Sequence, residues 1–346
     1  MSDFRRILVI RRDNIGDLVL TTPLIHALRQ HFPAAWIGAL TNSYNAPVLD
    51  GNPDLNMVYA YDKAKHRPDR ARLGVAARTA KLLLELRRQK TDLAILAAPG
   101  YQRHGAGLVR WIAAREVLGF AEPGRHRHLT MPVDYGTGAE LHAAADVFRL
   151  LAPLGVAGQP GPCHMYPDAT VRARIAAQLA PRQGRPVVAV HISARRPRQQ
   201  WPADHYAGVI NELQRRAQCM AMLLWAPGSA DDPRHPGDDA KALEVQRLIA
   251  ADVPMLAVPT TDLKTLAAAI SLCDLMVCAD GGAMHVAAAL GKPVVAMFGD
   301  SPVHRWRPWG VPHAVVAAPG ADLANLEPGA VIEAAAQLLQ HRADAP

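Results

Sequence analysis

The sequence has 346 residues but only four cysteines, and no two of them stand in C-x-x-C spacing. Three of the four lie within apolar runs, so we expect buried, reduced thiols rather than a disulfide framework or a zinc site. No stretch approaches the roughly 20 uncharged apolar residues that span a bilayer, and no secretory signal opens the chain. These absences predict a cytoplasmic protein.

Two motifs of nucleotide and metal chemistry are also missing. No G-x-G-x-x-G follows the first expected strand of either half, which argues against a dinucleotide dehydrogenase. No D-x-D pair occurs in the chain, which argues against a divalent metal held by paired carboxylates. We therefore expect neither a cofactor nor a metal.

Acidic residues are scarce in the first part of the chain. Residues 1–160 hold 21 Lys+Arg and 14 Asp+Glu, whereas residues 161–346 hold 17 of each, so the first part carries the whole net charge of +7. Nucleic acid, anionic lipid or a phosphorylated sugar would fit such a surplus. The alternative is a solvated arginine-rich surface, which charge alone favours. The basic residues are not interleaved with aromatic ones, so we expect no nucleic-acid partner.

What the chain does contain is an alternation of buried strands and amphipathic helices, typical of parallel sheets covered on both faces. Pro23 interrupts the first helical pattern, so a regular helix is expected to begin near Thr22. The expected strands are 7–10, 36–40, 57–60, 93–97, 187–192, 220–225, 275–279 and 294–298, and the clearest helices are 73–89, 169–179, 203–216, 262–271 and 328–340. The fold class is α/β.

A linker rich in glycine and proline, 155–162, divides the chain. It predicts domains over 1–160 and 161–327, and a C-terminal helical segment, 328–346, that could pack back across the boundary. The same architecture occurs in both halves without a strong sequence repeat. Two Rossmann-like, doubly wound domains facing each other across a cleft would follow, with ligands at the carboxyl ends of the strands.

The most informative segment runs from Asp280 to Pro302. Gly281 and Gly282 stand where an expected strand turns into a short helix, which leaves backbone N–H groups and a positive helix end facing one point. Such a point suits a phosphate. Asp280 and His285 add titratable groups nearby. An ordinary strand–helix–strand turn would explain the glycines alone.

Three landmarks in order resemble the heptosyltransferase family, glycosyltransferase family 9. The first is Asn14-Ile15-Gly16-Asp17, followed by Thr22-Pro23. The second is His191-Ile192-Ser193-Ala194-Arg195 with Trp201-Pro202, and the third is Asp280–Pro302. Each alone is weak, but together they span residues 5 to about 302.

The resemblance implies a GT-B enzyme in which the C-terminal domain binds the sugar nucleotide. It implies inverting, metal-independent transfer of a heptose from ADP-heptose to the lipopolysaccharide inner core or a related anionic glycan. The acceptor would explain the basic first half, and peripheral contact with the cytoplasmic face of the inner membrane would follow.

The resemblance also assigns site residues. Asp17 would be the general base that takes the proton of the acceptor hydroxyl, with Asn14 and Gly16 on the acceptor side. A helix-capping aspartate is the plainer alternative.

Donor phosphates would be bound by backbone donors and arginines at the second and third landmarks. These donor-side residues are Ser193, Arg195, Arg198, Asp280, Gly281, Gly282 and His285. Relatives often have lysine two residues before Trp-Pro, where this chain has Gln199, and Arg198 is expected to substitute. Trp225, Pro227 and Gly228 resemble the region that receives the nucleoside.

Two other functions stay open. The chain could be a GT-B enzyme, transferase or epimerase, that uses another sugar nucleotide. The replaced lysine also leaves room for an inactive GT-B-fold binding protein.

Overall fold

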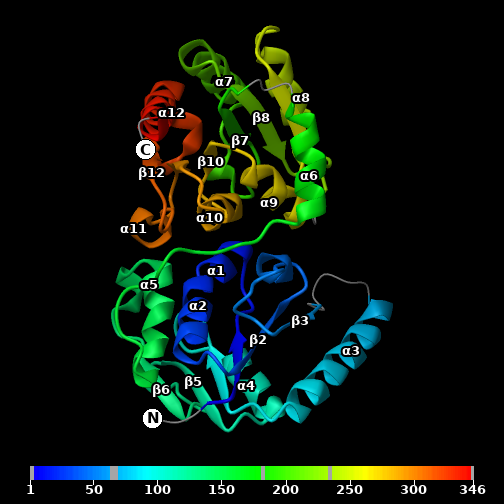
Figure 1. Cartoon of the computed structure of the whole chain (residues 1–346), viewed down its shortest axis with the longest axis vertical. Helices are drawn as coiled ribbons and strands as arrows, with labels where there is room; N and C mark the ends of the chain where they lie inside the picture. Colours follow the sequence, from blue (N-terminus) through cyan, green and yellow to red (C-terminus); the bar gives the residue numbers. More distant parts are fainter. Residues whose placement is uncertain (1–3, 63–68, 181–183, 233–235, 344–346) are drawn as a thin grey trace. The chain divides into compact units, whose positions relative to one another are not determined.

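The computed structural model describes residues 4–62, 69–180, 184–232 and 236–343. The chain divides into two compact units, Met1–Met165 and Tyr166–Pro346. Each unit is a parallel sheet with helices packed around it (Figure 1).

The sheet of the first unit has the strand order β3-β2-β1-β4-β5-β6. Its strands are β1 (Arg6–Ile10), β2 (Trp36–Asn42), β3 (Met57–Tyr61), β4 (Leu93–Leu96), β5 (Glu116–Ala121) and β6 (Met131–Asp134). The helices between and after them are α1 (Ile15–Val19), α2 (Thr22–His31), α3 (Asp69–Arg88), α4 (Arg103–Ile112) and α5 (Ala143–Phe148). The central strands β1 and β4 are almost entirely buried, as expected for a sheet covered on both faces.

The second sheet has the order β12-β11-β10-β7-β8-β9. Its strands are β7 (Val187–His191), β8 (Met220–Trp225), β9 (Met255–Pro259), β10 (Leu275–Ala279), β11 (Val294–Phe298) and β12 (His313–Ala317). Its helices are α6 (Ala169–Gln178), α7 (Ala203–Ala217), α8 (Asp239–Leu248), α9 (Leu263–Ser271), α10 (Gly282–Ala289), α11 (Val303–Trp306) and α12 (Pro328–Ala343). Counted along each unit, both sheets have the order 3-2-1-4-5-6 of dinucleotide-binding folds, so the predicted pair of Rossmann-like sheets is confirmed.

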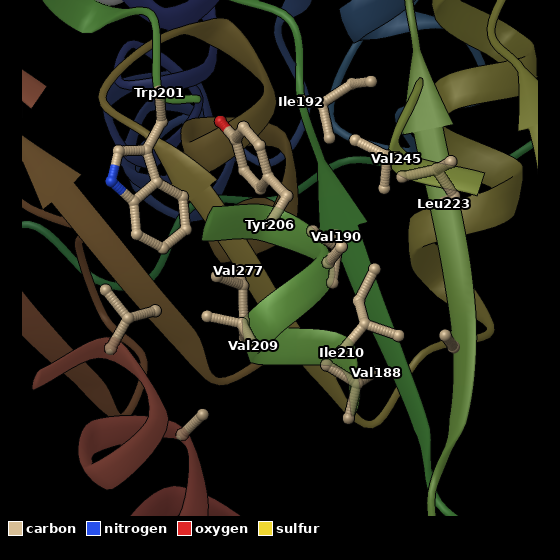
Figure 2. Packing of buried hydrophobic residues seen from close by; sticks show 14 of the residues in the cluster. Val188, Val190, Ile192, Trp201, Tyr206, Val209, Ile210, Leu223, Val245 and Val277 are labelled. Atoms are coloured by element: carbon tan, nitrogen blue, oxygen red, sulfur yellow. The ribbon is translucent and has the colours of Figure 1, made fainter. Parts of the chain in front are cut away.

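Alternation along β7 builds the core of the second unit. Val188, Val190 and Ile192 point to one face, where they meet the buried side of α7 (Figure 2). Trp201 lies in the same cluster and its indole N–H donates to the carbonyl of Leu326 at 2.7 Å. Trp201 of the Trp-Pro landmark is thus a core residue that fixes the loop before it.

The elements that sequence predicted are largely confirmed. Helix α2 begins at Thr22 with Pro23 in its first turn, after the short separate helix α1. The last helix, α12, packs against α7 and the strands β10, β11 and β12 of the second unit. All four cysteines are buried, and none of them forms a disulfide within the described residues.

Candidate functional site

Asp17 lies in the short helix that follows β1. One carboxylate oxygen accepts hydrogen bonds from the backbone N–H and the side-chain amide of Asn14, both at 3.1 Å. The other oxygen pairs with the guanidinium of Arg11 at 2.8 Å. Only 12 % of the Asp17 side chain is exposed, so the carboxylate is held in one orientation at the carboxyl end of the strand. Gly16 is buried within the helix, and Asn14 caps it.

Arg11 holds Asp17 in place, and sequence reasoning missed it. It is the first residue after β1 and is only 3 % exposed. Besides Asp17 it pairs with Asp13 at 3.1 Å and donates to the carbonyl of Ala97, just beyond β4. Arg11 therefore spans the point between the first and fourth strands, where the strand order reverses and ligands bind in folds of this type. A charged residue directly after a buried strand was the available signal.

Two buried asparagines, Asn42 at the end of β2 and Asn45 in the turn after it, fix the same loop. The side-chain amide of Asn42 donates to the carbonyls of Arg12 and Asp13, each at 3.1 Å. The amide of Asn45 donates to the carbonyl of Asp13 at 3.0 Å. These asparagines were also missed, although their spacing in a turn after a strand was visible.

In the second unit, three loops meet at the carboxyl ends of β7, β10 and β11. Gln199 is buried, and its amide donates to the Asp280 carboxylate at 3.1 Å and to the Ser301 hydroxyl at 3.3 Å. Arg196 reaches the same hydroxyl at 3.5 Å. Burial raises the pKa of Asp280, and hydrogen bonds from Ser301 and Gln199 oppose that rise. Gln199 thus joins Asp280 to Ser301 as a neutral donor.

The arginines of the β7–α7 loop differ in their contacts. Arg195 and Arg198 are exposed, and no side-chain hydrogen bond or ion pair to either is found within the described parts of the chain. A Cβ at Gly299 would come within 2.9 Å of the Arg198 carbonyl, so that glycine lets the loop pack closely on the end of β11. Both guanidinium groups remain available to an anion.

The start of α10 carries the predicted phosphate cradle. Gly281 is the N-cap and Gly282 the first helical residue, and a Cβ at Gly281 would meet no atom within 4 Å. The backbone here is therefore open to close approach. His285 stands one turn further along, is 4 % exposed and packs edge-on against Trp306. Its ring lies within the packed interior of the unit.

The predicted nucleoside region is braced by an unforeseen carboxylate, Asp239. The indole N–H of Trp225 donates to one of its oxygens at 2.7 Å, and the backbone N–H of Gly228 donates to the other at 2.9 Å. The Ser193 hydroxyl accepts from the backbone N–H of Ala226 at 2.8 Å, which joins the loops after β7 and β8. Trp225 is buried, whereas Pro227 and Gly228 are partly exposed.

No trio of His, Cys, Asp or Glu side chains is grouped as a metal site in the residues that the structure describes. Within the same residues, none of the helices has both the length and the apolar character needed to cross a membrane.

Comparisons with known proteins agree with this geometry. Residues 79–331 match the family model of glycosyltransferase family 9 (heptosyltransferase). The chain is 27 % identical over 314 residues to lipopolysaccharide heptosyltransferase 3 of Escherichia coli (strain K12), covering 85 % of this chain and 82 % of that protein.

Solved structures show the same fold. The glycosyltransferase family 9 protein of Veillonella parvula DSM 2008 superposes with a TM-score of 0.80 at 21 % identity, covering 98 % of this chain and all of that chain (100 %). The ADP-heptose lps heptosyltransferase II of Escherichia coli gives a TM-score of 0.77 at 20 % identity, with 98 % and 99 % covered.

Proposed function

The chain belongs to glycosyltransferase family 9, the heptosyltransferases, and we propose that it transfers a heptose from ADP-heptose to the lipopolysaccharide inner core or a related anionic glycan. That it is a glycosyltransferase with the GT-B fold follows from the family and the fold. The observation that carries the finer proposal is the fixed carboxylate of Asp17 at the carboxyl end of β1. The donor is proposed from the relative whose name includes ADP-heptose, and the acceptor from the relatives named for lipopolysaccharide.

Asp17 acts as the general base. As the acceptor hydroxyl oxygen attacks the anomeric carbon, its proton passes to the Asp17 carboxylate. The bond from that carbon to the diphosphate oxygen breaks, and ADP leaves with the electron pair. Attack opposite to the leaving group inverts the anomeric centre. The carboxylate oxygen that pairs with Arg11 accepts one hydrogen bond, whereas the other accepts two from Asn14, so the oxygen beside Arg11 keeps a lone pair for the proton.

The leaving diphosphate meets the second unit. Backbone N–H groups of Gly281 and Gly282 and the guanidinium groups of Arg195 and Arg198 stabilise its charge. With these donors the transfer proceeds without a metal. Ser193, Pro227 and Gly228 border the nucleoside. The first domain binds the acceptor. His285, one turn into α10, stabilises the start of the helix that binds the phosphate.

The anionic acceptor brings this protein to a membrane surface. The basic surplus of residues 1–160 suits both the acceptor and the lipids around it. Peripheral contact at the cytoplasmic face is therefore included in the proposal.

A donor panel tests the proposal. Purified protein is incubated with a heptose-free lipopolysaccharide core and, in parallel, ADP-heptose, ADP-glucose, UDP-glucose or GDP-mannose, and the glycan product is identified by mass spectrometry. We expect product with ADP-heptose, undiminished by EDTA. Product with another donor only would show that ADP-heptose is not the donor. An isomerised sugar nucleotide would indicate an epimerase. Loss of product with EDTA would contradict metal independence. If the protein binds ADP-heptose but transfers no sugar to any of a range of acceptors, it is an inactive binding protein with the GT-B fold.

A further inference from the structure

Helices α3 and α4 lie side by side on one face of the first sheet (Figure 1). Their inner sides share one apolar cluster with the strands, to which Leu86, Val109 and Ile112 belong. A hydrogen bond from the Arg87 guanidinium to the carbonyl of Trp111, at 3.4 Å, joins their C-terminal ends. The two helices therefore present one continuous outer surface.

The segment that contains these two helices accounts for the net charge of the chain. Residues 69–115 hold 10 Lys+Arg against 3 Asp+Glu, a surplus of seven. The rest of the chain has 28 of each sign, because 38 less 10 and 31 less 3 both leave 28. Helices α3 and α4 alone hold 8 Lys+Arg against 2 Asp+Glu, so six of the seven surplus charges lie on two neighbouring helices, which a randomly solvated arginine-rich surface would not produce.

Large apolar side chains stand among these charges. Trp111 is 69 % exposed and Leu84 is 57 % exposed. Spacing places Leu84 in a stripe with Lys81 and Arg88 on α3, and Trp111 follows Arg110 on the outer side of α4. The sheet already buries the inner apolar sides of both helices, so the fold does not use these two residues.

We propose that the α3–α4 face, formed by Lys81, Leu84, Arg88, Arg103, Arg110 and Trp111, docks on a bilayer of anionic phospholipids. Cationic side chains are attracted to the negative surface of such a bilayer. Tryptophan is enriched at the headgroup level of membranes, where an apolar ring and a polar N–H are both satisfied. Duplex nucleic acid would attract the charges equally but would give the exposed leucine nothing.

This inference deepens the membrane contact of the proposed function and rests on it only for its biological sense. Its test uses the full chain without donor or acceptor, so failure of lipid binding and failure of sugar transfer are read separately.

Vesicles of phosphatidylcholine, with or without phosphatidylglycerol, are sedimented with the protein. We expect binding that requires phosphatidylglycerol and weakens with salt. Arg88→Glu combined with Arg110→Glu should reduce the partition coefficient at least tenfold, and Trp111→Ala and Leu84→Ala several-fold each. Far-UV circular dichroism and thermal melting confirm that each variant is folded.

Matched controls come from the second unit. Leu243 on α8 is 54 % exposed, so Leu243→Ala removes a comparable apolar side chain elsewhere. Arg172→Glu combined with Arg174→Glu makes the same change of charge on α6. Equal losses in these controls, equal binding to neutral vesicles, or binding to duplex DNA but not to vesicles would each overturn the proposal.

Discussion

In both units a side chain links the end of the first strand of the sheet to the end of the fourth, but the linking side chain is charged in one unit and neutral in the other. In the first, buried Arg11 crosses from the end of the first strand to Ala97 beyond the fourth, and its charge is met by two carboxylates. In the second, the neutral amide of Gln199 crosses to Asp280 at the end of the fourth strand. The exposed Arg195 and Arg198 stand beside it without protein partners in the described residues.

The first unit therefore positions a carboxylate, whereas the second offers charges that bind a ligand. The carboxylate of Asp17 is fixed by the protein alone and needs no ligand to orient it. In the second unit Arg195 and Arg198 keep their charges available, so an anionic ligand can bind to them. Four changes test this contrast, in order of expected effect.

Asp17→Asn should lower kcat by about a thousandfold, because it removes the base while keeping the size of the side chain. Binding of ADP, measured by calorimetry, should not change. The control is Asp13→Asn, since Asp13 is the other carboxylate on Arg11 but lies more exposed. Full turnover by Asp17→Asn would reduce Asp17 to a helix cap.

Arg11→Met should lower the free energy of unfolding by about 3 kcal/mol, because it leaves Asp17 and Asp13 without their cation. Arg11→Lys keeps a positive charge and should restore part of kcat with little change in KM, which a purely structural role would not produce. Urea unfolding and steady-state kinetics measure both. Arg12→Met serves as the control because the Arg12 guanidinium donates to the Tyr61 hydroxyl. A loss in the control as large as that of Arg11→Met would argue against a special crossing.

The second unit should lose stability in mild acid through His191. Burial, and secondarily nearby Lys241, lowers the pKa of His191 from 6.5 to about 4. The unfolded chain therefore takes up a proton below pH 6.5 that the folded chain refuses, and stability present above pH 6.5 is lost as the pH falls towards 4. His191→Gln should remove about 2 kcal/mol of that loss.

Denaturant melts at a series of pH values measure this effect, with exposed His304→Gln as the control. Parallel acid profiles of wild type and His191→Gln would contradict the assignment.

Gln199→Lys is expected to have the smallest effect. The new ammonium adds one cation beside Asp280 and should tighten ADP binding about fivefold, equivalent to about 1 kcal/mol. Gln200→Lys places the same charge on the neighbouring exposed residue and should do less. Calorimetric titration with ADP compares the two. Weaker ADP binding by Gln199→Lys would show that the neutral amide is itself required.

The fold was largely predictable because most strands are continuous buried runs. The expected strand 187–192 corresponds to β7. Pro23 correctly predicted that helix α2 begins at Thr22. Strands β5, β6, β9 and β12 were missed, since β5 opens with a glutamate and the other three are only partly buried. A short strand with an exposed edge leaves little apolar pattern to detect.

The site was predictable only as a set of strand ends. Parallel topology brings the residues after each strand to one edge, which is why Asp17 and Asp280 could be chosen. Side-chain direction was not encoded in that pattern. Only the structure shows that the Trp225 indole donates its hydrogen bond to Asp239 and that the Gln199 amide donates to Asp280.

Every recorded strand pairing joins two strands of the same unit, within residues 6–134 or within residues 187–317. The first sheet therefore has all its partners before the second has been translated. A nascent chain can complete one hydrophobic core on the ribosome while the other is still being synthesised, which shortens the time that either set of strand edges is open to aggregation.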